Sequence, residues 1–402
     1  MEYKQMRIAC IVGARPNFMK IAPILRAMKP YSNLEPTLIH TGQHYDAQLS
    51  DVFFQELGIS RPNISLGVGS GSHAKQTSDI LVAVEKVLLD AHNQGNPFDR
   101  MLVVGDVNST MAAAVAATKL CIPVAHVEAG LRSFDRTMPE EINRVLTDAI
   151  CDMLLVSEPS GVENLRKEGH AQENIHLVGN VMIDTLLHQV QIAQQNTILN
   201  DNGLVPGTFG VVTLHRPSNV DHPAVLRSLL DVLNEISVRL PLVFPIHPRT
   251  RTRLDEFGFA DILDRSENIC CTGPLGYNDF LCLTSQAKVI VTDSGGLQEE
   301  STALGVPCLT LRSNTERPIT VTEGTSTLVG SDSEKLKKHL NRIIDGTYKK
   351  GKCPDLWDGH AAERIAEILA NQTSQTATTK QEVKPHSLSN HGSTGSATIG
   401  LN

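Results

Sequence analysis

A short segment rich in carboxylates contains the first residues that could carry out chemistry. The segment VAHVEAGLRSFDRTMPEEINR, residues 124–144, places Glu128 at the end of an apolar run and Glu140 and Glu141 after Pro139. Carboxylates in such a place can transfer protons on a bound molecule when they face a cleft. The segment could equally be a surface loop with solvated acids, and by itself it is compatible with both.

Other groups with acid–base chemistry follow apolar runs elsewhere in the chain. Asp106 ends MLVVGD, His215 ends GVVTLH and His247 ends LVFPIH. A single histidine or acid at such a position is more often a satisfied polar residue than a catalyst. Ligands of open parallel sheets, however, bind beyond the carboxyl ends of the strands. The recurrence of these groups therefore predicts a cleft that all of them face.

Two segments could bind an anion at the start of a helix. GARPNFMK, residues 13–20, combines a predicted helix start with Arg15 and Lys20. TDSGGLQEE, residues 292–300, places Ser294, Gly295 and Gly296 before an apparent helix. Small residues there leave backbone N–H groups free to contact a phosphate. Either segment could also be an ordinary strand–helix turn.

The elements that must position these residues alternate between strands and helices. Apolar runs typical of buried strands occur at 7–12, 37–42, 101–106, 123–128, 153–158 and 175–180, and again at 210–215, 242–247, 268–273, 289–294 and 307–312. Helical patterns separate them, for example at 16–28 and 111–120. Near-continuous apolar strands alternating with helices predict an α/β fold with parallel sheets.

Length and composition indicate two domains followed by a tail. The pattern of strands and helices is interrupted once, in a long connection after residue 180, and 402 residues suffice for two cores. We therefore predict a first domain over residues 1–180 and a second over 181–357. Residues 371–402 are rich in Ser, Thr, Gln and Gly, a composition that predicts a disordered tail.

Charge and cysteine usage exclude several classes of function. The net charge of −8 argues against a nucleic-acid partner. No apolar run is long enough to span a bilayer, and the N-terminus does not resemble a signal peptide, so no membrane partner and a cytoplasmic location are expected. The eight cysteines show no metal-ligand spacing, which predicts free thiols and no metal site.

An ordered set of motifs identifies a family that the chain resembles. The motifs are GARPNFMKIAP, TGQHYD, VVGDVNST, PVAHVEAGLRS, MPEEINR, TLHR, IHP, TDSGGLQEE and TERP, and they extend over about residues 6–370. Together they resemble the non-hydrolysing UDP-N-acetylglucosamine 2-epimerases. The resemblance implies two Rossmann-like domains in the GT-B arrangement with a cleft between them. It also implies a C-terminal helix at about 358–370 that joins the first domain, and a homodimer.

The resemblance further implies a substrate, a mechanism and a set of site residues. Family members interconvert UDP-GlcNAc and UDP-ManNAc by eliminating UDP to form 2-acetamidoglucal and adding it back. This chemistry is redox-neutral and GARPN is not GxGxxG, so no cofactor is expected. The catalytic residues carried over are Asp106, Glu128, Glu140, His215 and Lys20. The substrate-binding residues carried over are Arg15, His247, Leu275, Phe280, Ser294, Gly295, Gly296, Glu300 and Arg317.

Departures from the family pattern leave several activities compatible with the sequence. The usual GTRPE is GARPN here, and Gln43 and His44 are followed by Tyr45 and Asp46 instead of continuing a QHR-type segment. The first departure could shift specificity toward a modified UDP-N-acetylhexosamine, and the second puts allosteric activation by UDP-GlcNAc in doubt. The sequence is also compatible with a hydrolysing epimerase that releases ManNAc and UDP, with a GT-B glycosyltransferase, and with a catalytically silent nucleotide-sugar sensor.

Overall fold

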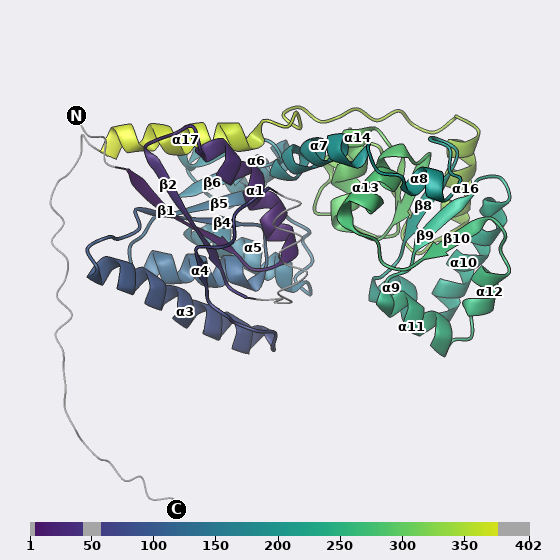
Figure 1. Ribbon diagram of the computed structural model, residues 1–402, viewed down its shortest axis with the longest axis horizontal. Coiled ribbons are helices and arrows are strands. Elements are labelled where there is room, and N and C mark those ends of the chain that lie inside the picture. Colours follow the sequence, from purple (N-terminus) through teal and green to yellow (C-terminus); the bar gives the residue numbers. More distant parts are fainter. Residues whose placement is uncertain (1–4, 43–57, 377–402) are drawn as a thin grey trace, which may run out of the picture.

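The computed structural model describes residues 5–42 and 58–376 of the chain. Within these residues the strands form two separate sheets, each entirely parallel, as the apolar runs predicted. Figure 1 shows the two sheets side by side, each with helices on its faces. The α/β fold class with two Rossmann-like domains is confirmed.

The first sheet contains seven strands among the described residues, in the order β3-β2-β1-β4-β5-β6-β7. They are β1 (Met6–Val12), β2 (Leu34–His40), β3 (Ile64–Ser65), β4 (Arg100–Val104), β5 (Val124–Ala129), β6 (Met153–Val156) and β7 (Ile175–Leu177). The connecting helices are α1 (Arg15–Met28), α3 (His73–Asn93), α4 (Asn108–Lys119), α5 (Pro139–Ile150), α6 (Pro159–Lys167) and the 3₁₀ turn η1 (Gln172–Asn174). Alternate strand residues are buried beneath α1 on one face and beneath α3 and α4 on the other.

The second sheet has six strands in the described part of the chain, in the order β10-β9-β8-β11-β12-β13. They are β8 (Gly210–Thr213), β9 (Leu242–Pro245), β10 (Ile269–Thr272), β11 (Val289–Thr292), β12 (Cys308–Thr310) and β13 (Ser326–Leu328). Its helices are α9 (Pro217–Val220), α10 (Pro223–Ser237), α11 (Pro248–Glu256), α12 (Ala260–Asp264), α13 (Tyr277–Gln286), α14 (Gly295–Leu304), α15 (Ile319–Thr322) and α16 (Ser333–Ile344). One face packs against α10 and α16, and the other against α13 and α14.

Two strands of the structure were not predicted from the sequence. β3 has two residues and β13 has three, so neither contains an apolar run long enough to stand out. Both lie at the edges of their sheets, where one strand neighbour suffices. Their omission does not change the fold class.

The order of the strands creates a crevice in each sheet. In the first, β1 lies between β2 and β4, so the chain leaves β1 toward one side and returns on the other. In the second, β8 lies between β9 and β11 in the same way. At such a switch point the loops after two neighbouring strands separate and leave room for a ligand. The segments that follow these strands contain Lys20 and Asp106 in the first sheet, and His215 and Ser294 in the second.

Two helices connect the domains. The helix α7 (Val181–Ala193) contributes Val181 and Met182 to the core of the first sheet, and Ile183 and Leu186 to that of the second. The short helix α8 (Ile198–Asp201) follows it. The connection between the sheets is therefore a packed helix, which restricts how they move relative to one another.

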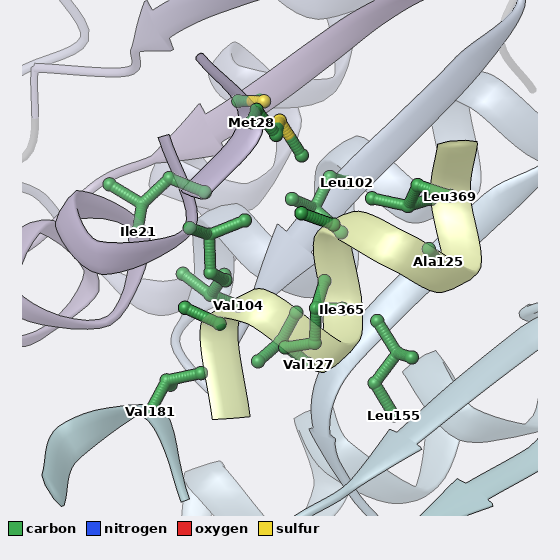
Figure 2. Close-up of a cluster of buried hydrophobic side chains, with 14 of the residues drawn as sticks. Ile21, Met28, Leu102, Val104, Ala125, Val127, Leu155, Val181, Ile365 and Leu369 are labelled. Carbon is green, nitrogen blue, oxygen red and sulfur yellow. The ribbon is translucent and has the colours of Figure 1, made fainter. Parts of the chain in front are cut away.

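The last helix, α17 (Ala361–Thr376), crosses back to the first sheet. Figure 1 shows it in yellow over the first domain, after the chain has left the second. Ile365 and Leu369 of α17 are fully buried against Leu102, Val127 and Ile21 (Figure 2). The carboxylate of Asp184 accepts hydrogen bonds from the amides of Ala361 and Ala362 and so caps α17. Residues 371–376, predicted as the start of the disordered tail, instead form the last turns of α17. The rest of the predicted tail, 377–402, lies outside the described residues, as do Gln43 and His44.

Two features are absent from the described residues. No helix among them is long and apolar enough to cross a membrane. No three His, Cys, Asp or Glu side chains among them are grouped so that they could hold a metal ion.

Candidate active site

The backbone at Glu128 is held in an unusual conformation. Glu128 lies near the end of β5 and has φ of +73°. The pairing of β5 with β6 shifts register between Val127 and Ala129, so Glu128 is the extra residue of a bulge. A bulge redirects the side chain, and a left-handed backbone costs a glutamate about 1 kcal/mol or more. This local strain places the Glu128 carboxylate beyond the strand, where it meets the second domain.

The Glu128 carboxylate joins the two domains through a buried ion cluster. Its Oε2 lies 2.5 Å from Nζ of Lys20, which projects from α1. Its Oε1 accepts a hydrogen bond of 3.1 Å from Nη2 of Arg317, which belongs to the second domain. All three side chains are less than a tenth exposed. Three residues predicted for the site from separate parts of the sequence are thus brought into direct contact.

Arg317 also binds two carboxylates of its own domain. Its Nε lies 2.7 Å from Glu299 and its Nη1 lies 2.6 Å from Glu316. Burial alone would lower the pKa of Arg317, but Glu299, Glu316 and Glu128 together raise it well above its ordinary value. Arg312 pairs with Glu316 at 2.9 Å. Arg317 is therefore a permanent cation, held in place on three sides.

Asp106 follows β4 and contacts a different cation. Nη2 of Arg144 donates to its Oδ2 at 2.5 Å, and Asn143 donates to its backbone oxygen at 2.9 Å. Burial favours the neutral acid, but the charges of Arg144 and Lys20 outweigh it and hold the pKa of Asp106 below its ordinary value. Asp106 is therefore a carboxylate at neutral pH, and can accept a proton but not donate one.

The two adjacent glutamates at the start of α5 have different surroundings. Glu141 is buried, and its carboxylate accepts hydrogen bonds from the amides of Ser133 and Phe134 and from Arg144. Glu140 is exposed in the first turn of the same helix. The charge of Glu140 acts on Arg216 across the cleft. The structure therefore places Glu141 as the residue that holds the loop before α5, and leaves Glu140 to face the opposite domain.

Six of the residues predicted to bind substrate or act in catalysis line one cavity of the second domain. The cavity has a volume of about 330 Å³. Its lining consists of Thr213, Leu214, His215, Pro245, Ile246, His247, Pro274, Tyr277, Phe280, Ser294, Gly296, Leu297 and Glu300. An apolar floor with a few polar groups is typical of a small-molecule site.

His215 is anchored by an acid that was not predicted from the sequence. Its Nδ1 lies 2.7 Å from Oδ1 of the fully buried Asp293. The amides of His215 and Arg216 both donate to Oδ2 of Asp293 at 2.9 Å. Asp293 precedes Ser294 in TDSGG, but the sequence around a single acid in a turn does not reveal that it pairs with His215. The sequence therefore showed the histidine and missed the residue that orients it.

Two other polar groups of the cavity, His247 and Glu300, have shifted pKa values that favour their neutral forms. His247 caps α11, and its Nδ1 accepts from the amide of Arg249 at 3.1 Å. Burial, and next the charge of His215, lower the pKa of His247 below its ordinary value. Burial, followed by the neighbouring Glu299, raises the pKa of Glu300 to about 8. In the free protein both side chains are therefore mostly neutral near pH 7.

The helix α14 connects the cavity with the ion cluster. Its first turn contains Gly295 and Gly296, and Gly296 lines the cavity. A Cβ atom on Gly295 would lie 3.1 Å from Glu316 and 3.3 Å from Arg312, so a larger side chain would disturb the ions beside Arg317. Helix N-termini with small residues bind phosphate through free amides and the helix dipole. The arrangement of α14 and Arg317 fits a bound diphosphate.

Two of the predicted substrate-binding residues, Leu275 and Arg15, have no side chain placed in the cavity or the ion cluster. Leu275 is half-buried and packs at the edge of the apolar cluster that contains Phe280. Arg15 is the first residue of α1, and its side chain lies outside the described part of the structure. Sequence reasoning also missed Arg144, Glu299 and Glu316, which contact predicted residues from distant parts of the chain.

Comparison with known proteins identifies the family to which this fold belongs. Two parallel α/β domains with a charged cleft between them define the GT-B class. The model of the protein family described as UDP-N-acetylglucosamine 2-epimerase matches residues 26–370 of this chain. A protein of that name from Methanocaldococcus jannaschii is 42% identical over 90% of this chain and 99% of its own length. A Pseudomonas aeruginosa protein named UDP-2,3-diacetamido-2,3-dideoxy-D-glucuronate 2-epimerase is 38% identical over 91% of this chain and 99% of its own length.

Solved structures agree with this assignment. The structure of the M. jannaschii UDP-GlcNAc 2-epimerase in complex with UDP-GlcNAc and UDP has a TM-score of 0.79 at 42% identity, and covers 91% of this chain and 100% of its own. That of the Neisseria meningitidis UDP-GlcNAc 2-epimerase bound to UDP-GlcNAc has a TM-score of 0.80 at 26% identity, over 91% of this chain and 100% of its own. The chain belongs to the UDP-N-acetylglucosamine 2-epimerase family, and the resemblance drawn from its motifs is confirmed.

Proposed function

We propose that this chain catalyses the reversible epimerisation of UDP-GlcNAc to UDP-ManNAc at C2. Membership of the family supports the general activity. The observation that carries the proposal is the contact of Glu128 with Lys20 and Arg317, since it brings an acid–base group of one domain against a phosphate-binding group of the other. The reaction needs an acid–base group to take the proton from the sugar carbon. It also needs a phosphate-binding group, in the same site, to hold the departing diphosphate.

Elimination and re-addition account for the two kinds of group. C2 of the sugar is next to no carbonyl, so its proton is not acidic enough for simple removal. In the proposed reaction a carboxylate takes the C2 proton while the C1–O bond to UDP breaks. The C–H electron pair forms the C1–C2 double bond of 2-acetamidoglucal, and UDP leaves with the other pair. Protonation on the opposite face and re-addition of UDP then give the epimer.

Each group of the site has a part in this scheme. Asp106, Glu128 and Glu140 transfer protons and position the sugar, and Lys20 positions Glu128. Arg317 and the start of α14 hold the diphosphate, where fixed positive charge stabilises the departing anion. His215 contacts the same diphosphate, and Glu300 and Phe280 in the cavity bind ribose and uracil. A homodimer in the cytoplasm, without a cofactor, stays a prediction.

Proton NMR of the purified protein with UDP-GlcNAc in D₂O tests the proposal, with no cofactor added. The expected product is UDP-ManNAc carrying deuterium at C2. Free ManNAc together with UDP would instead identify a hydrolysing enzyme. An unchanged spectrum with confirmed UDP-GlcNAc binding would contradict the proposal. The next substrate to try would then be UDP-2,3-diacetamido-2,3-dideoxy-D-glucuronate, because the P. aeruginosa relative is named for it, and no turnover of either would favour a sensor.

A further inference from the structure

The carboxylate of Asp293 has a partner for each of its oxygens. Oδ1 lies 2.7 Å from Nδ1 of His215. Oδ2 accepts from the amides of His215 and Arg216, both at 2.9 Å, and from Nδ2 of Asn219 at 3.1 Å. Asp293 itself is completely buried. The only group among these partners that can change its proton is the His215 ring.

These contacts determine which nitrogen of the ring carries a proton. Three N–H donors point at Oδ2, so that oxygen is an acceptor. Burial favours the neutral acid, but the hydrogen bond from His215 and the two amides keep the pKa of Asp293 below its ordinary value. An ionised carboxylate accepts hydrogen bonds and donates none. Nδ1 of His215 must therefore donate to Oδ1, and Nε2 is the nitrogen left for a ligand.

The neighbouring histidine is held in the opposite form. Nδ1 of His247 accepts a hydrogen bond from the amide of Arg249, so a neutral His247 carries its proton on Nε2. The ring centroids of His215 and His247 lie 5.5 Å apart, and both rings line the cavity. In their neutral forms, His215 thus offers a proton acceptor at Nε2, and His247 offers a donor at Nε2.

We propose that Asp293 is a positioning residue that fixes the Nδ1–H tautomer of His215 and so presents Nε2 to the departing diphosphate. The part played by the diphosphate rests on the proposed function, whereas the tautomer does not. When His215 is protonated, Nε2–H can give its proton to the phosphoryl oxygen as the C1–O bond breaks. The ring then returns to the neutral Nδ1–H form, and Asp293 stays ionised throughout.

Asp293→Asn tests the proposal because the amide has the same shape as the carboxylate. Its oxygen can take the place of Oδ2 and keep the three donors that hold the turn. Its NH₂ group then faces Nδ1 of His215, which must become an acceptor and move the ring proton to Nε2. We expect kcat with UDP-GlcNAc to fall about 100-fold or more, with a much smaller change in KM.

The tautomer is read directly from ¹⁵N NMR of protein labelled in its histidines, with His215→Gln used to assign the signal. The wild type should show Nδ1 protonated and Asp293→Asn should show Nε2 protonated. Asn219→Ala is the matched control, because it removes one hydrogen bond to Asp293, together with one to the backbone oxygen of Leu311, and leaves the ring contact intact. It should keep the wild-type tautomer and a kcat within about threefold.

Several outcomes would overturn the proposal. A wild-type spectrum with Nε2 protonated would do so without any variant, which covers the case that Asp293→Asn does not fold. An unchanged tautomer in Asp293→Asn, an inverted tautomer with wild-type kcat, or an equal loss of kcat in Asn219→Ala would do so as well. If the wild type epimerises no substrate, the proposed function fails, but the tautomer is still measured.

Discussion

At the scale of single residues, the acids of the cleft differ in what surrounds them. Glu128 is held by a bulge and two cations, and Asp106 by Arg144. Glu141 satisfies backbone amides, whereas its neighbour Glu140 is exposed toward the second domain. An acid that holds a loop and an acid that transfers a proton should therefore respond differently to replacement by the neutral amide.

Replacing each glutamate by glutamine separates these two roles. Glu128→Gln and Glu140→Gln should lower kcat by about 1000-fold or more, because a proton acceptor is lost. Glu141→Gln should lower the free energy of unfolding by about 1–3 kcal/mol, because buried amides and Arg144 lose a charged acceptor. Enzyme assays and urea unfolding measure both. The assignment is wrong if Glu140→Gln unfolds earlier while keeping the wild-type rate.

A glycine beside Lys20 offers a second test at this scale. A Cβ atom on Gly105, which has φ of +71°, would lie 2.8 Å from Nζ of Lys20. Gly105→Ala should therefore displace Lys20 from Glu128 and lower kcat about tenfold or more. Gly95→Ala is the control, since Gly95 has φ of +73° and no atom within 4 Å of the added Cβ. Both variants should lose roughly 1 kcal/mol of stability, and equal kcat values would contradict the role given to Lys20.

At the scale of elements, α17 comes at the end of the described chain but packs in the first domain. It follows the whole second domain, yet its buried side chains belong to the core of the first sheet. Asp184 of α7 caps it, and the side chain of Asn33 donates to the backbone oxygen of Ala370 in its second half. The first domain is therefore complete only after the second has been synthesised.

A cavity in α17 should weaken the first domain and spare the second. Ile365→Ala should cost about 2–5 kcal/mol, because Ile365 is fully buried. Amide hydrogen exchange should then accelerate in β4 and β5 more than in β8 and β11. Leu340→Ala of α16 is the matched variant and should show the reverse pattern. Acceleration of both sheets by Ile365→Ala to the same extent would mean that the domains unfold as one unit.

At the scale of the whole molecule, a buried acid lies where the domains meet. Glu158, which follows β6, is 1% exposed, and its Oε1 accepts from Ser160 at 2.5 Å. Burial is the largest cause that raises its pKa to about 7, and Glu299 of the second domain raises it further. Nearby, Nε1 of Trp357 donates to the backbone oxygen of Ser157 at 3.1 Å, which ties the segment before α17 to the same place.

The pH dependence of stability should report on Glu158. Its pKa rises from 4.5 to about 7 on folding, so the folded state binds more protons between these values. The stability linked to the bound proton is present at low pH and is lost as pH rises through 7, by up to about 3 kcal/mol. Glu158→Gln lacks this loss, because the amide resembles the protonated acid.

Urea unfolding of both proteins at pH 5 and pH 8 measures the effect. The free energy of unfolding of Glu158→Gln, relative to the wild type, should increase between the two pH values. Comparing the two proteins at each pH removes the contribution of the other acids. A difference that is the same at both pH values would contradict the raised pKa.

Local sequence was sufficient to predict most of the parallel strands and the helices between them. It also indicated the carboxyl ends of the strands as the place where a ligand would bind. Apolar runs such as those ending before Asp106 and His215 report burial on both faces, and strand ends carry the polar groups that a ligand meets. Short edge strands such as β3 were missed, because two residues carry no periodicity.

The partners of the site residues were decided only by the tertiary structure. Glu128 and Arg317 are 189 positions apart in the chain, and His215 and its anchor Asp293 are 78 apart. A local pattern cannot encode such a contact, because it depends on how two sheets pack and on a bulge that turns one side chain. The strand ends thus indicate which residues can do chemistry, while the packing of the domains selects which of them act on one another.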